Sequence, residues 1–258
     1  MIPESSEVLD LKKRGKILIL TLNRPERMNA FNLELMQRLE DAWKLFKRDD
    51  DLWVAILTGA GDKAFCAGQD LAERSQKPGE SSSGVPRPAY SPVGIWKPII
   101  AAINGYALGG GFQLAKECDI RIAAEHAELG IAETRWNMAA SWTWDITQVL
   151  PRGLGLEIAL WGDMRIRAQR AYEIGLVNRV VPKEKLMDEA MSWAERMLSL
   201  GPRAVSDMKQ IIYLGPYWTP SGGLANAWAI MQNLDGMEDS IEGPAAFSAK
   251  RKPIFKNK

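Results

Sequence analysis

Short blocks of hydrophobic residues run through the first half of the chain and predict strands mixed with helices. Apolar residues at 8–11 and 17–22 flank Arg14 and Gly15, a pattern typical of a β-hairpin. Residues 33–47 carry apolar side chains at helical spacing. Three short continuous apolar runs predict buried strands: 54–58, 98–103 and 120–123.

From about Trp144 onward the spacing of apolar residues becomes mostly helical. Six segments share this spacing: 154–161, 168–174, 186–200, 202–213, 224–233 and 243–249. Strands mixed with helices, followed by helices alone, favour an α/β core with a helical C-terminal part. We place the core in residues 1–200 and the helical region in 201–258. Residues 77–93 are rich in Pro, Ser and Gly and predict a long mobile loop.

Composition describes an ordinary soluble globular protein and excludes several classes of partner. The 258 residues are 46% hydrophobic and 25% charged, with a net charge of +1, so no global field favours nucleic acid or a membrane surface. Cys66 and Cys118 are far apart and lack a CxxC partner, which argues against a metal site or a disulfide framework. No secretory signal or membrane span is visible, so we expect a cytoplasmic protein.

The chain has one histidine, His126, which lies in a polar segment and is expected on the surface. Mechanisms built on a Ser-His or Cys-His pair are therefore disfavoured. Acid–base chemistry falls to carboxylates, lysines or tyrosines.

A glycine triplet, Gly109–Gly111, follows the apolar run at 98–103 and predicts a helix start. Glycine allows a ligand to approach the backbone closely, and N–H groups at a helix start can hold a negative oxygen. The side chain two residues past the triplet is Gln113, which neither gives nor takes a proton at neutral pH.

Several segments together resemble the crotonase family of enoyl-CoA hydratases and isomerases, over nearly the whole chain. They are Leu22–Pro25 with Asn29-Ala30, Ala64–Leu71, Lys97–Gly111, Gly175–Val177 and Phe247–Pro253. The resemblance implies an α/β, ClpP/crotonase-like spiral of ββα units with a helical C-terminal region that forms trimers, often paired into hexamers. It also implies an acyl-CoA thioester substrate, often of fatty acid metabolism, with no cofactor beyond the coenzyme A of the substrate.

In this family two backbone N–H groups bind the thioester carbonyl, and by motif position these are Gln69 and Gly110. Proton removal beside a thioester, or addition of water to its conjugated double bond, develops an enolate. Two fixed donors, one at a helix start, stabilise that charge, and losing one typically costs about 100- to 1000-fold in rate.

Hydratases of the family use two glutamates, and this chain matches only the second. Glu133 occupies that position, and its apolar neighbours favour a pKa raised toward the operating pH. The first position holds Gln113. Three mechanisms stay open: hydration in which Glu133 activates water that Gln113 orients, a one-base double-bond isomerase, and a hydroxycinnamoyl-CoA type of hydratase/lyase. A non-catalytic acyl-CoA-binding member is a further alternative.

The expected substrate contacts come from four places. Eight residues after Glu133, where dienoyl-CoA isomerases carry an aspartate, stands Ser141, and the nearby Trp136 and Trp142 suit core packing or a flat acyl group. The loop with Arg27 and Met28 resembles the segment that touches adenine. The remaining candidates are Ala67, Asp70 and Leu71 beside Gln69, and Phe255 and Lys258 of the basic tail, which could reach a neighbouring subunit's nucleotide. No dinucleotide or Walker-type spacing is present.

Overall fold

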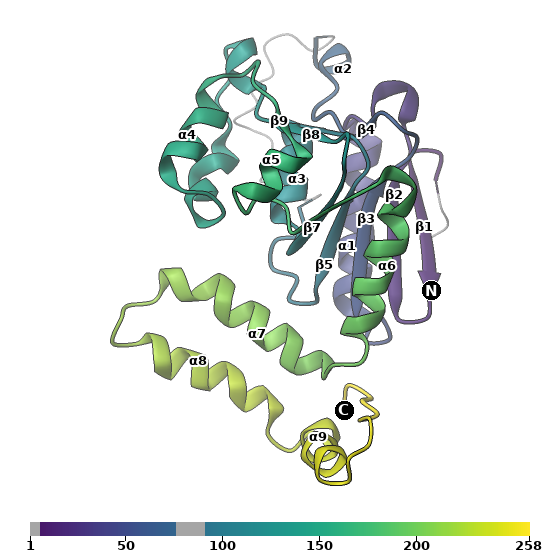
Figure 1. Cartoon of the computed structure of the whole chain (residues 1–258), viewed down its shortest axis with the longest axis vertical. Coiled ribbons are helices and arrows are strands. Elements are labelled where there is room, and N and C mark those ends of the chain that lie inside the picture. Colours follow the sequence, from purple (N-terminus) through teal and green to yellow (C-terminus); the bar gives the residue numbers. More distant parts are fainter. Residues whose placement is uncertain (1–5, 76–90) are drawn as a thin grey trace.

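The computed structural model of the protein describes residues 6–75 and 91–258, and two β-sheets form its frame (Figure 1). The larger sheet has the order β1-β2-β3-β5-β7-β10. Its strands are β1 (Leu9–Arg14), β2 (Ile17–Leu22), β3 (Val54–Gly59), β5 (Ile99–Ile103), β7 (Ile120–Ala124) and β10 (Arg179–Val181). Strands β1 and β2 form the predicted antiparallel hairpin, and the other neighbours are parallel.

The second sheet is built from four short strands in the order β4-β6-β8-β9. They are β4 (Ala64–Cys66), β6 (Tyr106–Leu108), β8 (Glu128–Gly130) and β9 (Ile166–Arg167). The chain passes from β3 to β4, from β5 to β6 and from β7 to β8, and after each pair it enters a helix. This repeated passage is the spiral of ββα units that the resemblance to the crotonase family implies.

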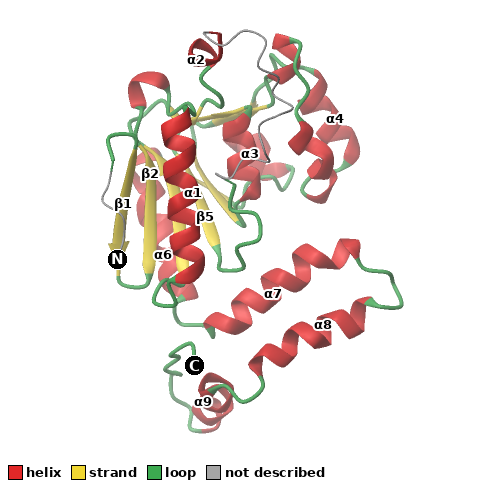
Figure 2. Ribbon diagram, turned by 180° about the vertical axis from the view of Figure 1, so that it is seen from behind, coloured by secondary structure: helices red, strands yellow, loops and turns green. Residues whose placement is uncertain are grey.

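Helices pack on both faces of the larger sheet. The α-helices are α1 (Leu33–Arg48), α2 (Leu71–Ser75), α3 (Gly110–Glu117), α4 (Arg152–Leu160), α5 (Ala168–Glu173), α6 (Leu186–Met197), α7 (Pro202–Leu214), α8 (Gly223–Met231) and α9 (Glu238–Ser248). Figure 2 shows α1 in front of the sheet and α6 behind it. Helix α1 begins at Asn32, whose side chain accepts a 2.9 Å hydrogen bond from the N–H of Leu35.

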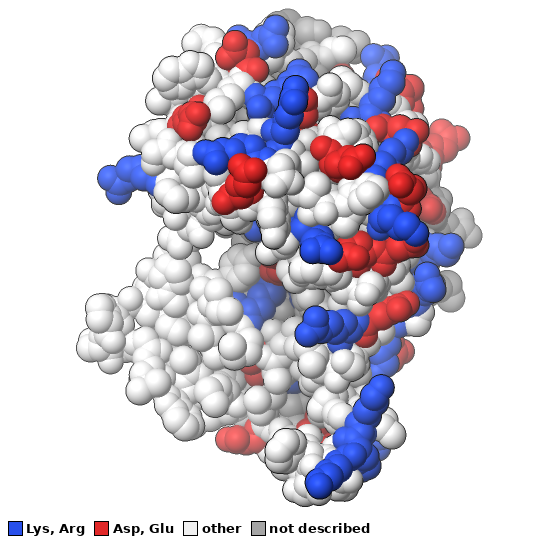
Figure 3. All heavy atoms as spheres, viewed as in Figure 1, with Lys and Arg blue, Asp and Glu red and all other residues white. Residues whose placement is uncertain are grey.

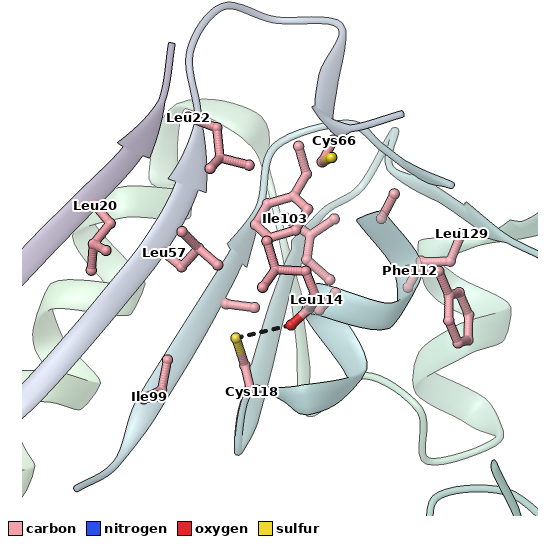
Figure 4. Packing of buried hydrophobic residues seen from close by; sticks show 14 of the residues in the cluster. Leu20, Leu22, Leu57, Cys66, Ile99, Ile103, Phe112, Leu114, Cys118 and Leu129 are labelled. Carbon is pink, nitrogen blue, oxygen red and sulfur yellow. Dashed lines mark hydrogen bonds between the residues drawn. The ribbon is translucent and has the colours of Figure 1, made fainter. Parts of the chain in front are cut away.

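Two hydrophobic clusters result, one on each face of the sheet. The larger joins α1 to α3 and includes Leu20, Leu57, Phe112 and Leu114 (Figure 4). The smaller packs α6 against the opposite face. Both cysteines lie in the larger cluster as free thiols. The core therefore holds α3 firmly against the sheets, and α3 carries the glycine triplet.

The C-terminal helices α7–α9 extend away from the sheets (Figure 1). Lys209 in α7 ties them to the core, because its Nζ lies 2.7 Å from the Asp119 carboxylate and 3.0 Å from the carbonyl oxygen of Lys97. Helix α8 buries none of its residues. Within the described residues, no helix has the length and apolar character needed to cross a bilayer.

The predicted hairpin, the three longer strands and the six helical segments are confirmed, with ends shifted by a few residues. The largest shift is in α9, which begins at Glu238 instead of residue 243 and contains Pro244. Most of the loop predicted at 77–93 lies outside the described residues. The short strands of the second sheet were not predicted, because two or three residues show no periodicity.

Candidate active site

The three glycines join β6 to α3 in a way that only glycine permits. Gly109 has a φ of 54° and a ψ of −122°. A β-carbon on Gly111 would collide with the carbonyl oxygen of Cys66 in β4. Gly110 is the first residue of α3, so its N–H has no acceptor within the helix and lies at the positive end of the helix dipole.

The loop at Gly68 packs directly against this helix start. Gly68 has a φ of 89°, and a β-carbon there would lie 2.8 Å from the carbonyl oxygen of Leu108 and 3.0 Å from the backbone nitrogen of Gly110. Phe31 pairs with the peptides on both sides of Gln69: its N–H donates to Gly68 O at 2.7 Å, and its carbonyl accepts from Asp70 N–H at 2.9 Å. The segments that carry the two predicted donors, Gln69 and Gly110, are therefore in contact.

Glu133 faces the same helix start from the 3₁₀ helix η3 (Glu133–Trp136). A β-carbon on Gly109 would lie 3.4 Å from Glu133 Oε1. Oε2 is buried and has no hydrogen-bond partner among the described residues. Burial raises the pKa of Glu133, and hydrogen bonds from its own N–H, from the Trp142 side chain and from Ala132 N–H only partly offset this effect. A raised pKa suits a carboxyl group that both takes and returns a proton.

Trp142 connects Glu133 to α3 from the 3₁₀ helix η4 (Ser141–Gln148). Its ring stacks on Phe112 with the ring centroids 5.9 Å apart. The buried Lys116 of α3 donates to the carbonyl oxygen of Trp142 at 3.2 Å and forms an ion pair with Asp145. Asp145 thereby neutralises the charge of Lys116. These contacts fix η4 on α3 beside Glu133.

Gln113 is buried in the second turn of α3, and its amide is held by a carboxylate. Its Nε2 donates to Glu117 Oε1 at 2.9 Å, and Ser91 Oγ donates to Glu117 Oε2 at 2.5 Å. Gln113 lies four residues after Gly109, whose carbonyl oxygen accepts from Gln113 N–H at 3.0 Å. Gln113 therefore lies one turn beyond the glycine that Glu133 meets.

The loop predicted to touch adenine lies beside the Gly68 loop. Met28 and Asn29 both adopt the left-handed conformation, with φ of 51° and 55°. The N–H of Ala67 donates to the carbonyl oxygen of Met28 at 3.0 Å, which joins the two loops. Arg27 and Met28 are exposed on this loop. A ligand that follows the Met28 loop thus arrives beside the segment of Gln69.

An ion pair braces both loops. Arg24 lies 3.2 Å from the Asp70 carboxylate, and its other guanidinium nitrogen donates to the carbonyl oxygen of Ala30 at 2.6 Å. Burial opposes ionisation of Asp70, but hydrogen bonds from Glu73 N–H and from Arg24 outweigh it and lower its pKa. Asp70 is thus a charged brace at the start of α2, next to Gln69. Leu71 follows as the first residue of α2 and is exposed.

Other predicted substrate contacts lie around the rim or elsewhere. Ser141 and Trp136 are exposed, so Trp136 is not core packing. Phe255 packs near Gly201 and Gly243 of its own chain. The C-terminal residue, Lys258, is marked C in Figure 1, at the end of the molecule opposite α2 and β4. In this chain the tail therefore does not meet the Glu133 site.

The remaining reactive side chains do not form a second centre. Burial raises the pKa of the Cys66 thiol to about 12, so it is not a nucleophile at neutral pH. His126 is exposed as expected, and its Nε2 lies 3.1 Å from the carbonyl oxygen of Asn104. Among residues 6–75 and 91–258, no group of three His, Cys, Asp or Glu side chains could hold a metal ion.

Sequence reasoning missed three residues that shape the site: Arg24, Ser91 and Glu117. Glu117 stands four residues after Gln113 in a predicted helix, and this spacing was a usable signal for a side-chain pair. Arg24 and Asp70 are 46 positions apart, so only the fold reveals their contact. Ser91 lies in a polar segment without periodicity.

Comparison with known proteins gives one consistent result. The model of the enoyl-CoA hydratase/isomerase family matches residues 12–258. The chain is 36% identical over 252 residues to (E)-benzylidenesuccinyl-CoA hydratase of Thauera aromatica, covering 95% of this chain and 98% of the relative. It is 34% identical over 266 residues to carnitinyl-CoA dehydratase of Salmonella enteritidis PT4, covering 98% of this chain and 100% of the relative.

Solved structures agree in fold over nearly the full length. An enoyl-CoA hydratase from Mycobacterium tuberculosis H37Rv superposes with a TM-score of 0.91 at 33% identity, covering 98% of this chain and all of that one. An enoyl-CoA hydratase from Bacillus anthracis has a TM-score of 0.89 at 35% identity, covering 97% and 100%.

Proposed function

The chain belongs to the enoyl-CoA hydratase/isomerase family, within the crotonase superfamily, and we propose that it hydrates an enoyl-CoA or dehydrates the corresponding hydroxyacyl-CoA. One observation carries the proposal: the buried carboxyl group of Glu133 lies against Gly109, beside the N–H of Gly110 at the start of α3. A proton-transferring group and an anion-stabilising group thus stand together.

The backbone donors bind the thioester oxygen in this proposal. The N–H groups of Gln69 and Gly110 both donate to the carbonyl oxygen, and their attraction strengthens as the enolate forms. Two contacts fix the positions of these N–H groups before substrate arrives. They are the close approach of Gly68 to the nitrogen of Gly110 and the pairing of Phe31 around Gln69. Such preorganised donors are typically worth about 100- to 1000-fold each.

Glu133 moves the proton. Its carboxylate takes a proton from water as the water oxygen bonds to Cβ, and the π electrons shift through Cα to the thioester oxygen. The resulting carboxylic acid returns the proton to Cα as the enolate collapses. Gln113 orients the attacking water through its amide and transfers no proton. Dehydration follows the same steps in reverse.

A double-bond isomerase is the second candidate, because Gln113 leaves one acid–base residue. In that reaction Glu133 removes a proton from Cα of a β,γ-enoyl thioester and returns it to Cγ, which moves the double bond to the α,β position. The same backbone donors hold the dienolate. No water takes part, so Gln113 only fills space beside the acyl group.

For the acyl group, we propose a flat or branched group in place of a straight chain. Trp142 stacks on Phe112 next to Glu133, and Trp136 is exposed one turn after Glu133. Aromatic faces of this kind favour planar groups. The relatives that act on benzylidenesuccinyl-CoA and carnitinyl-CoA support this choice, because neither name denotes a simple fatty acyl thioester.

We also propose that the chain self-associates through α7 and α8 into a trimer or a pair of trimers. Helix α8 has no charged residue and buries none of its side chains. Its large apolar residues Leu224 and Trp228 are 72% and 59% exposed. Figure 3 shows the corresponding lobe almost free of charged side chains. A helix that is apolar all round is normally covered. In such an assembly Phe255 and Lys258 would serve a neighbouring site.

Turnover of a thioester panel tests the proposed reaction. The panel holds a short linear enoyl-CoA, a β,γ-enoyl-CoA, an alicyclic dienoyl-CoA and a hydroxycinnamoyl-CoA, with loss of the enoyl absorbance and product mass as readouts. We expect water addition to an α,β-enoyl thioester. Migration of a double bond without water uptake would select the isomerase instead, and no reaction with any thioester would contradict both.

A further inference from the structure

A carboxylate is present on the site's helix, one turn beyond the position where the sequence has Gln113. Glu117 Oε1 accepts the 2.9 Å hydrogen bond from Gln113 Nε2, and Ser91 Oγ occupies Oε2. Gln113 and Glu117 are four residues apart and lie on one side of α3, and Gly109 is the residue before the first turn of this helix. Glu117 is about 12 Å along the helix from Gly109, which is too far for direct proton exchange with the reacting carbons.

The contact decides which way the Gln113 amide points. A carboxylate accepts hydrogen bonds and donates none, so the NH₂ group of Gln113 must be the part that faces Glu117. The carbonyl Oε1 is then left as a hydrogen-bond acceptor. Gln113 is only 3% exposed, so the reversed amide would bring Oε1 against a carboxylate with little water to separate them.

We propose that Glu117 is a positioning residue that holds Gln113 as an acceptor, and that this pair has room for only one negative charge. The inference deepens the proposed function and rests on it: Oε1 of Gln113 would accept a hydrogen from the attacking water or from a substrate hydroxyl. The negative charge of this part of α3 then stands at position 117, next to the neutral amide of Gln113.

Gln113→Glu alone should therefore not create a second base at position 113. Two carboxylates would then meet at about the 2.9 Å separation of the present hydrogen bond, and like charges this close do not both ionise. The pair would keep one proton at neutral pH and would supply no second base. Replacing Glu117 by Gln at the same time restores the hydrogen bond with the roles reversed.

Three ionisable groups on α3 and on the 3₁₀ helices beside it, all among the described residues, bear on this charge pair. Lys116 on α3 is already neutralised by Asp145 of η4. Glu133 of η3, which meets Gly109 one turn before position 113, adds no positive charge. Cys118, at the end of α3, has its pKa raised by burial and stays neutral.

A four-variant cycle tests the proposal: the wild type, Gln113→Glu, Glu117→Gln and the double variant. The first readout is thermal unfolding of the full chain from pH 4.5 to 8 without substrate. In Gln113→Glu the folded pair retains a proton that the unfolded chain releases near pH 4.3, so Tm should fall more steeply with rising pH than in the wild type. In the double variant this additional slope should vanish.

The exposed pair Gln169 and Glu173 provides a matched control. It has the same i,i+4 geometry on α5, with Nε2 and Oε1 3.4 Å apart. Gln169→Glu puts two carboxylates in water, where they are screened, so its Tm should follow the wild-type pH dependence. If Gln113→Glu behaves like Gln169→Glu, the proposed sharing of one charge between positions 113 and 117 is refuted.

The second readout is hydration of the enoyl-CoA that the wild type turns over. Glu117→Gln should lower kcat about tenfold with little change in KM, as expected for the loss of one charge-assisted hydrogen bond. The double variant should exceed Gln113→Glu in kcat at neutral pH, whereas equal gains in both would overturn the proposal. If no variant turns over any thioester, the proposed function fails, and the unfolding cycle still decides the charge pair.

Discussion

The carboxyl group of Glu133 lies so close to Gly109 that a β-carbon on that glycine would be 3.4 Å from Oε1 and 3.6 Å from the carboxyl carbon. The acid–base group and the helix start therefore form one unit. In the proposed mechanism, a substrate held by the N–H of Gly110 would lie next to Glu133.

Gly68→Ala should separate the Gly68 loop from α3. A positive φ alone costs an alanine about 1–2 kcal/mol. At Gly68 the new methyl group also meets the Leu108 carbonyl at 2.8 Å and the Gly110 nitrogen at 3.0 Å. We expect a loss of stability and a fall in kcat, measured by chemical unfolding and by enoyl-CoA hydration.

Gly175→Ala is the control for that substitution. Gly175 has a φ of 78°, and a β-carbon there meets nothing within 4 Å. This variant should lose only the stability that the positive φ costs and keep its activity. Full activity in Gly68→Ala would show that the positions of the Gln69 and Gly110 N–H groups do not depend on contact between the loop and the helix start.

Trp142→Phe should move the pH profile. The interaction of Glu133 with the Trp142 side chain favours the ionised carboxylate, which lowers its pKa. Removing the indole N–H while keeping an aromatic ring should raise the pKa of Glu133 further. We expect the acid limb of kcat/KM to shift to higher pH. Trp144→Phe, at an exposed ring that packs on Tyr217, should leave the limb in place.

Glu133→Gln should raise the thermal stability of the protein above pH 4.5, because it removes a carboxyl group that is costly to ionise in the folded state. Because burial raises the folded-state pKa above 4.5, the native state binds more protons than the unfolded state from about pH 4.5 up to that raised value. The wild type therefore loses stability as pH rises through this window. Glu133→Gln lacks this loss, so its Tm should exceed that of the wild type at pH 8, and the difference should shrink toward pH 4.5. A pH-independent difference would contradict the burial account.

Trp228→Glu should disrupt assembly. A charge in the middle of α8 would be costly to bury against another chain but harmless in water. We expect the wild type to sediment as three or six chains of 28.7 kDa and the variant to sediment as a smaller species. Leu33→Glu, at a comparably exposed leucine on α1, should leave the mass unchanged. A wild-type monomer would refute the proposed interface.

Much of the frame could be predicted from the sequence, because its strands and helices have strong periodicity. Val54–Gly59 is buried along its full length, and α1 carries its apolar residues on one face. The strands of the second sheet could not be predicted. They have two or three residues each and are held by pairing with distant segments, as Leu108 pairs with Gly130.

The site was partly predictable for a related reason. Glu133 and the glycines lie in local motifs, so their sequence neighbours identify them. The contact between Arg24 and Asp70, and the hydrogen bond from Ser91 to Glu117, join residues that are far apart in the chain. Local patterns carry no information about such contacts. Gln113 was recognised as a departure from the family pattern, but its partner Glu117 became evident only from the structure.

The most direct test of the central claim is the turnover of Glu133→Gln, measured together with its affinity for an acyl-CoA thioester. Glutamine keeps the size of the side chain and removes the transferable proton. We expect kcat to fall at least about 100-fold, the lower range for a general acid–base residue, while the Kd for the thioester by titration calorimetry stays nearly unchanged. Undiminished turnover would contradict the assignment of Glu133 as the residue that carries the proton.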